Sequence, residues 1–316
     1  MHVNNFVEII LGRLYNKAQI SLLNEVKIDS EKINRGDVFI AKNENKIRNA
    51  INNGAYAIVS EKELEIIDFE IAWIVVEDIN LAISRFIKYY QIINNTPFYK
   101  CDPITYKILK NIIKDKNISI CNSLEEVLEG INSKIIILDS IIKLDGVISI
   151  ESRNSEIFKA KQKSIFNLNL EYENNIYEII FPYEFIGFLN EAIYFCKLQR
   201  INFVIQNQYL ELMPIFINYD GNAIKNGKSI RFAYASKDNF LLNQYAKIIE
   251  NARWGRSLFL SKRNLENKKN AMQYNLIKDV KEKLKLRKYH FFLIEGIEKN
   301  ELLNAINLEN KESQLF

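Results

Sequence analysis

Residues 29–43 read Asp29-Ser-Glu-Lys-Ile-Asn-Arg-Gly-Asp-Val-Phe-Ile-Ala-Lys-Asn43. The dipeptide Gly36-Asp37 is typical of a turn, and the apolar run 38–41 directly after it predicts a short buried strand. A strand of this kind, set between helical segments, is characteristic of layered α/β domains. The stretch therefore predicts the core of an α/β domain.

The sequence on both sides extends this pattern. Helical spacing of apolar residues occurs over three segments, 3–15, 47–53 and 80–93. Strand-like runs occur over three more, 20–28 (loosely), 57–59 and 74–76. Gly54 is expected to end the second helix, and Asn80 to cap the third. We therefore expect an α/β domain over residues 1–95.

Alternation of helices and strands continues through the rest of the chain. After a boundary at Pro97, helices are expected over 104–113, 124–131, 184–199, 240–251 and 271–287. Strands are expected over 117–121, 134–138, 146–150, 229–234, 257–260 and 289–294, with a hairpin over 168–182. This order favours mainly parallel sheets. The fold class is thus α/β, in three successive domains over 1–95, 96–228 and 229–316.

Composition and charge exclude several classes of protein. A hydrophobic content of 48% and a charged content of 26% are those of an ordinary globular protein. The three cysteines, Cys101, Cys121 and Cys196, show no CxxC pairing, so we expect neither a disulfide framework nor a metal site. The sequence has no signal-peptide pattern and no uncharged apolar run of the roughly 18 residues that a membrane span needs. We therefore expect a cytoplasmic protein.

The opening stretch resembles the first domain of the Mur ligases, whose pattern is D-S-R-x-x-x-x-G-D-x-F-x-A-x-x-G. Six residues match it in register: Asp29, Ser30, Gly36, Asp37, Phe39 and Ala41. A later family segment, G-A-x-A-x-V, is matched by Gly54, Ala55, Ala57 and Val59. In the family this domain binds the uridine diphosphate end of the peptidoglycan precursor. The resemblance therefore implies that the six residues belong to a substrate-binding site.

Two departures from the family pattern occur in the same region. Glu31 stands where the family usually has Arg. Between Ala41 and Gly54 the chain is about six residues shorter than the family pattern, and the Gly and D-G-H residues of that loop are missing. The loop approaches the nucleotide in the family, so its loss weakens the case for uridine recognition.

The nucleotide-binding loop of the family is altered further. Mur ligases begin their second domain with G-T-N-G-K-T, a P-loop in which backbone amides cradle phosphates, Lys neutralises them and Thr holds magnesium. Residues 97–109 stand at that place and contain no glycine and no Lys-Thr pair. Lys100 and Thr105 are the remaining candidates for nucleotide contact. We expect no ATP binding here, and a central domain trimmed relative to the family.

Another glycine-rich segment, 221–229, resembles G-x-x-x-x-G-K-S but has one residue too many between its glycines. A strand-like run follows it where a P-loop needs a helix. We therefore interpret it as a turn between two strands. Weaker likenesses to the family occur at 185–198 in the central domain and at 232–240 in the C-terminal domain.

The first hypothesis is a Mur-ligase-like protein of bacterial cell-wall synthesis without ATP-dependent ligase activity, a pseudoenzyme. It would bind the UDP-N-acetylmuramoyl-peptide precursor or another cell-wall synthesis protein, and need no cofactor. The first alternative is a divergent active ligase, which would require ATP and magnesium. The second is nucleic-acid binding through the basic segment 278–288, although a net charge of only +4 favours a solvated helix face there. Two histidines, His2 and His290, leave little scope for histidine catalysis or metal binding, and no catalytic residue is predicted.

Overall fold

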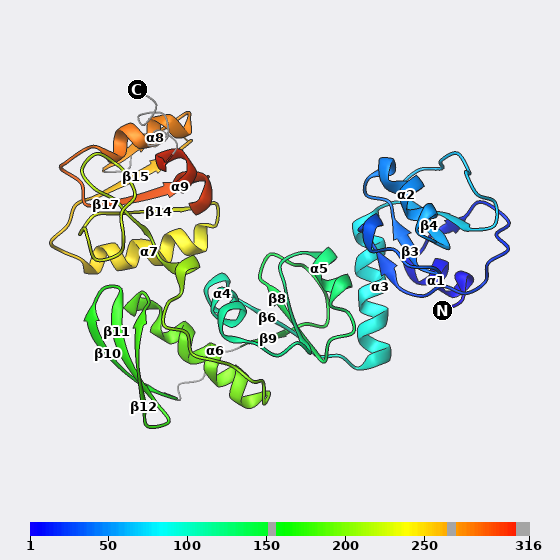
Figure 1. Ribbon diagram of the computed structural model, residues 1–316, viewed down its shortest axis with the longest axis horizontal. Coiled ribbons are helices and arrows are strands. Elements are labelled where there is room, and N and C mark those ends of the chain that lie inside the picture. Colours follow the sequence, from blue (N-terminus) through cyan, green and yellow to red (C-terminus); the bar gives the residue numbers. More distant parts are fainter. Residues whose placement is uncertain (151–155, 264–269, 308–316) are drawn as a thin grey trace. The chain divides into compact units, whose positions relative to one another are not determined.

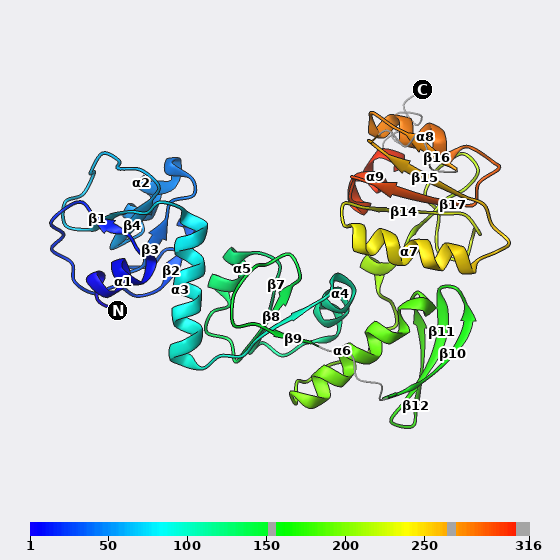
Figure 2. The same ribbon diagram turned by 180° about the vertical axis from the view of Figure 1, so that it is seen from behind.

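The computed structural model describes residues 1–150, 156–263 and 270–307 (Figures 1 and 2). The chain forms two compact units. The first contains the described residues of 1–102, 113–151 and 198–203, and the second those of 103–112, 152–197 and 204–316. Each unit holds two sheets. The predicted domain boundaries near residues 95 and 228 stay a prediction.

The first sheet of the first unit contains the opening stretch. Its strand order is β1 (Arg13–Leu14), β5 (Ala72–Val75), β4 (Ala57–Ser60), β3 (Val38–Ile40) and β2 (Val26–Lys27). All neighbours are parallel except β1 and β5. The strands predicted at 38–41, 57–59 and 74–76 are therefore confirmed, whereas the strand predicted over 20–28 is limited to β2.

The side chains of consecutive residues of β3 point to opposite faces of the sheet and so belong to different hydrophobic clusters. Val38 and Ile40 join the cluster beneath α1 (Val3–Ile10) and α3 (Ile79–Asn94), and Phe39 joins the cluster beneath α2 (Ile47–Asn52). The first face is closed by an edge-to-face contact between Phe6 and Phe86, whose ring centroids lie 5.7 Å apart. Burial on both faces explains why these strands are continuous apolar runs.

Two helix boundaries differ from the prediction. The first helix ends at Ile10 because Leu11 adopts a left-handed conformation with φ 51°, so the prediction of a helix to residue 15 was wrong. The third helix is capped by Asp78, whose Oδ1 accepts a hydrogen bond from the Leu81 amide at 2.8 Å. Asn80, the predicted cap, lies inside the first turn of that helix.

The second sheet has the order β7 (Ile118–Cys121), β8 (Ile135–Asp139), β6 (Phe98–Cys101) and β9 (Ile148–Ser149), and all its neighbours are parallel. The short helix α5 (Leu124–Glu129) follows β7. Helix α3 packs against both α1 and α5 (Figures 1 and 2), and α5 also contacts strand β2 of the first sheet. Residues of both sheets share one hydrophobic cluster, which includes Val38, Phe86, Leu128 and Ile136. The two sheets are therefore joined through a common core.

The second unit contains a helix, an antiparallel sheet and a second helix. These are α4 (Pro103–Ile112), the meander β10 (Lys159–Ser164), β11 (Asn167–Tyr172) and β12 (Asn175–Ile180), and α6 (Ile186–Leu198). The hairpin predicted at 168–182 is confirmed as β11 and β12. Strand β10 was not predicted, because almost all of its residues are polar and exposed and show no apolar alternation.

The second unit ends in another sheet, in the order β13 (Ile215–Phe216), β14 (Phe232–Ser236), β17 (Phe291–Glu295), β15 (Ser257–Ser261) and β16 (Ala271–Gln273). Only β13 is antiparallel to its neighbour. Helix α7 (Asn239–Asn251) covers one face, and α8 (Ile277–Leu284) with α9 (Lys299–Asn307) covers the other (Figures 1 and 2).

Two predictions in this sheet have different outcomes. Residues 221–229 lie in the connection between antiparallel strands β13 and β14, so the interpretation as a turn is confirmed. The helix predicted over 271–287 was wrong in its first part, because residues 271–273 form strand β16 and α8 begins at Ile277. Asp279 fixes that start by accepting hydrogen bonds from the amides of Asn275 and Leu276.

None of the helices within the described ranges is both long and apolar enough to cross a membrane. Among the same residues, no group of three or more His, Cys, Asp or Glu side chains is arranged to hold a metal ion.

Candidate functional site

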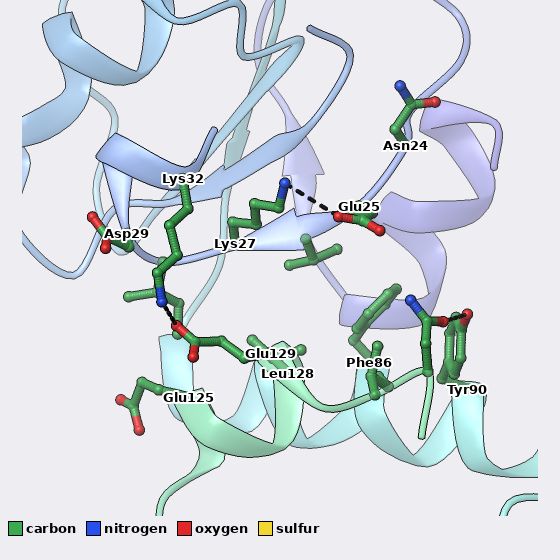
Figure 3. A pocket seen from close by; sticks show the side chains of 14 residues that line it. Asn24, Glu25, Lys27, Asp29, Lys32, Phe86, Tyr90, Glu125, Leu128 and Glu129 are labelled. Atoms are coloured by element: carbon green, nitrogen blue, oxygen red, sulfur yellow. Dashed lines mark hydrogen bonds and ion pairs between the residues drawn. The ribbon is translucent and has the colours of Figure 1, made fainter. Parts of the chain in front are cut away.

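A pocket of about 250 Å³ opens in the first unit, between the first sheet and α5. Its walls come from three stretches of chain (Figure 3). The lining residues are 24–29 and Lys32 from the edge of the first sheet, Phe86 and Tyr90 from α3, and Glu125, Leu128, Glu129, Ile131 and Asn132 from α5 and the residues after it.

The pocket has an apolar floor. Val26, Phe86, Leu128 and Ile131 are at most 9% exposed and belong to the shared core of the first unit. Val26, Phe86 and Leu128 come from β2, α3 and α5, and Ile131 follows α5; the side chains of all four pack into that core. The floor is therefore a by-product of packing, and it offers a ligand apolar surface next to an aromatic ring.

The rim is charged. Lys32 Nζ lies 2.6 Å from Glu129 Oε1, and the two side chains extend toward each other across the pocket (Figure 3). Lys27 Nζ lies 2.7 Å from Asp37 Oδ2 and 3.1 Å from Glu25 Oε2. Both lysines of the lining are thus held by carboxylates.

The ion pairs shift the pKa values of the rim. The hydrogen bond to Glu129 raises the pKa of Lys32. Burial disfavours the charged form of Lys27, but its hydrogen bonds to Asp37 and Glu25 outweigh this effect and raise its pKa. Burial acts against the charge of Glu125 as well, yet the hydrogen bond from Lys42 leaves its pKa lowered. These groups remain ionised at neutral pH.

Carboxylates outnumber amines around the pocket. Lysines contribute two positive charges, from Lys27 and Lys32. Acidic residues contribute four negative charges, from Glu25, Asp29, Glu125 and Glu129. The lining therefore carries a formal charge of −2, two positive against four negative.

Of the six residues that the sequence resemblance assigns to substrate binding, Asp29 lines this pocket. Its Oδ1 accepts a hydrogen bond from the Glu31 amide at 3.0 Å and so caps a 3₁₀ turn over Ser30–Lys32. Ser30 is 2% exposed, and its Oγ accepts a hydrogen bond from Asn49 Nδ2 at 3.0 Å.

Gly36 and Asp37 lie beside the pocket lining and bond to it. Gly36 has φ 97°, and a Cβ at this position would lie 2.4 Å from Nδ2 of Asn24. Asp37 is buried and accepts hydrogen bonds from the amides of Glu25 and Asn34 as well as from Lys27. These two residues thus hold the segment that forms one wall.

Phe39 and Ala41 are buried in the cluster on the opposite face of the first sheet, beneath α2. The structure therefore brings Asp29, Gly36 and Asp37 close to the pocket and places Phe39 and Ala41 away from it. Whether the six residues bind substrate stays a prediction.

The two residues predicted for nucleotide contact lie near the junction of β6 and α4. Lys100 is within β6, and Thr105 is buried in the first turn of α4. Strand β6 ends at Cys101 and α4 begins at Pro103, so Asp102 is the one residue between them. Neither Lys100 nor Thr105 lines the pocket.

Sequence reasoning missed most of the pocket. Lys32 lies inside the opening stretch and could have been chosen, but it is not one of the positions that match the family pattern. Phe86 is an apolar residue of the helix predicted over 80–93, and nothing in its pattern indicated that its ring would line a pocket. Glu125, Glu129 and Asn132 had no motif, and their partners are far away in the sequence.

No protein-family model matches this chain, and no curated protein sequence matches it. Several solved structures are similar to it. MurF from Acinetobacter baumannii is 11% identical, with 98% of each chain covered and a TM-score of 0.55. MurF ligase from Thermotoga maritima, solved in complex with ADP, is 12% identical, with 92% of this chain and 98% of the other covered and a TM-score of 0.52. The chain therefore has the fold of the Mur ligases, as the sequence resemblance predicted.

Proposed function

We propose that this chain is a Mur-ligase-like protein of peptidoglycan synthesis that lacks ATP-dependent ligase activity and acts by binding. Its partner is the UDP-N-acetylmuramoyl-peptide precursor or another protein of cell-wall synthesis. The similarity in fold to MurF structures over nearly the whole chain supports the connection to this process.

The loss of ligase activity is inferred from one observation, the junction between β6 and α4. A phosphate-binding loop needs several residues whose amides point at the phosphates, a lysine that neutralises them and a hydroxyl that holds magnesium. Here a single residue, Asp102, separates strand from helix, and the helix begins with Pro103, which has no amide hydrogen. Such a junction has no room for the loop.

The residues that might replace the loop are placed poorly for this role. Lys100 is paired within the sheet, in register with Leu138 of β8 and Ser149 of β9. Thr105 is 0% exposed, so its hydroxyl is not available to a hydrated magnesium ion at the surface. Asp102 would bring a negative charge close to the phosphates.

The binding role is supported by the pocket in the first unit. One of its walls contains Asp29 and lies next to Gly36 and Asp37, three of the residues that the family resemblance assigns to substrate binding. It combines an apolar floor with hydrogen-bonding and charged groups on the rim, which is the usual composition of a small-ligand site.

The competing function is a divergent active ligase. It is favoured by the similarity in fold to a MurF ligase that was solved with ADP. A ligase of this kind would have to bind ATP and magnesium without a phosphate loop.

A thermal-shift titration separates these functions. The full chain is titrated with ATP and magnesium, and separately with UDP-N-acetylmuramoyl peptide. A ligand that binds only the folded state stabilises it by about 2.7 kcal/mol at a hundred times its Kd. We expect no shift with ATP and magnesium; a saturable shift would overturn the proposal. A shift with the precursor identifies it as the ligand, and its absence assigns the binding role to a protein partner.

A further inference from the structure

The pocket is well formed but chemically unsuited to a diphosphate. Its formal charge of −2 has the same sign as a diphosphate, and like charges at close range repel. Both lysines of the lining already contact carboxylates at 2.6–3.1 Å. An anion would therefore have to displace a carboxylate from each lysine before it gained a counter-ion.

The same geometry suits a cation carried on an apolar stem. Phe86, Leu128 and Ile131 form a floor against which methylene groups can pack. The ring of Tyr90 stands at the end of the pocket beside Asn132, to which it donates a hydrogen bond (Figure 3). Aromatic rings at such positions attract guanidinium and ammonium groups.

Pocket size limits the ligand. A volume of about 250 Å³ is below the range of about 300–1,000 Å³ that is usual for drug-sized molecules. One extended side chain matches this space better than a whole nucleotide sugar does.

We propose that this pocket receives an arginine side chain of a partner protein. The inference rests on the proposed function and selects its second branch, in which the chain binds a protein of cell-wall synthesis. The stem of the side chain packs on Phe86 and Leu128, and its charged head meets the carboxylate of Glu129 at the position that Lys32 Nζ now occupies.

Entry of the cation requires only a local exchange of partners. The side chains of Lys32 and Glu129 are 56% and 55% exposed, so their ion pair contributes little to stability in water. An incoming guanidinium can replace Lys32 at Glu129 with two parallel hydrogen bonds, which a single ammonium does not provide. The displaced Lys32 is then solvated at the surface.

The test uses the ¹⁵N-labelled full chain and four probes. The first is the blocked tripeptide acetyl-Gly-Arg-Gly-amide, and the second is its citrulline analogue, which has nearly the same shape without the charge. The third is inorganic pyrophosphate, and the fourth is free spermidine. We expect the arginine peptide to shift the amide signals of residues 24–32 and 124–132. The citrulline peptide should bind about tenfold more weakly or not at all, because it lacks the charge.

Two variants locate the site. Glu129→Gln removes a rim carboxylate and should weaken arginine-peptide binding by about tenfold. Glu178→Gln is the matched control, since Glu178 also forms an exposed ion pair, with Lys163, but lies on β12 in the second unit. It should leave the affinity unchanged.

Five results would overturn the proposal: no shift of these amides by the arginine peptide, equal binding of the citrulline peptide, tighter binding of pyrophosphate at the same amides, equal effects of the two variants, or tighter binding of free spermidine than of the arginine peptide. The last would assign the pocket to a small polyamine in place of a protein. The ATP titration is independent of these results. Stabilisation by ATP would refute the proposed loss of ligation without altering the peptide data, and failure of the peptide would leave the ATP result intact.

Discussion

Lys32 and Glu129 lie 97 positions apart in the sequence, yet Lys32 Nζ is 2.6 Å from Glu129 Oε1. The pair joins the edge of the first sheet to α5 and crosses the pocket (Figure 3). A second pair, Lys42 with Glu125, makes a similar connection to the same helix. The two segments are thus held by a shared apolar core with ion pairs at its surface.

The Lys32–Glu129 pair should contribute little to stability. Lys32→Met, Glu129→Gln and the double variant are each expected to unfold at nearly the same urea concentration as the parent chain, because exposed ion pairs are well solvated and screened by salt. Equilibrium unfolding followed by tryptophan fluorescence measures this. A large coupling between the two substitutions would mean that the pair holds the pocket closed, contrary to the partner exchange proposed above.

Asp37 should contribute far more than Asp29 to the stability of the folded chain, although both belong to the opening stretch. The side chain of Asp37 is 3% exposed and accepts two backbone hydrogen bonds in addition to the ion pair with Lys27. Asp37→Ala is expected to cost about 3–5 kcal/mol, because it leaves Lys27 and two amides without their partner. Asp29→Ala removes only a cap and is expected to cost about 1 kcal/mol. Similar losses in urea unfolding of the two variants would contradict this assignment.

Replacing Arg231 in the second unit, even by lysine, is expected to destabilise the fold. It is fully buried and donates to the carbonyl oxygens of Tyr289, Asn218, Leu284 and Leu286 at 2.8–3.2 Å. Lysine cannot reproduce this planar fork of donors, so Arg231→Lys should destabilise the chain by about 3 kcal/mol.

The control for Arg231 is Arg287, which is exposed and also lies over the ring of Tyr219. Arg287→Lys should change the free energy of unfolding by less than about 0.5 kcal/mol. Equal effects of the two lysine variants would show that the carbonyl contacts of Arg231 are unimportant.

Lys299 should make stability depend on alkaline pH. Burial, together with the nearby charge of Lys107, lowers the pKa of Lys299 to about 8. Its Nζ also donates to the carbonyl oxygen of Met213 at 2.6 Å. In the unfolded chain its pKa is the ordinary value of about 10.4. Between these values the unfolded state holds the proton that the folded state has released.

The direction of the pH dependence follows from this difference in the pKa of Lys299 between the folded and unfolded chains. Where the unfolded state binds more protons, the free energy of unfolding rises with pH, here by up to about 1.4 kcal/mol per pH unit between about pH 8 and 10.4. Below pH 8 both states are protonated and the effect disappears. The parent chain should therefore gain stability relative to Lys299→Met over that window, measured by urea unfolding at pH 7.5, 8.5 and 9.5. A constant difference between the two chains, with Lys237→Met as the control for general alkaline effects, would refute the lowered pKa.

The parts of the fold that were predictable have local causes. The Gly36-Asp37 turn, strand β3 and the glycine after α2 each follow from a few adjacent residues. The predictions of secondary structure were wrong where contacts with residues distant in the sequence determine the conformation. Residues 271–273 look helical in isolation, but they form β16 because they pair with β15.

The candidate site was mostly unpredictable for the same reason. Its opening stretch was visible as a motif, but the structure shows that Asp37 serves the fold through hydrogen bonds to Glu25 and Asn34. The other walls come from Phe86 on α3 and Glu129 on α5, and only the shared core brings them together. No local pattern in the sequence records that the charges of the rim are already paired.

The central claim, that this Mur-ligase fold has lost nucleotide-dependent ligation, is tested most directly by calorimetric titration of the full chain with ATP in the presence of magnesium. With one residue between β6 and α4, we predict heats equal to those of dilution at every ATP concentration. A saturable one-site isotherm would contradict the account, since it would require a phosphate site that the β6–α4 junction does not provide.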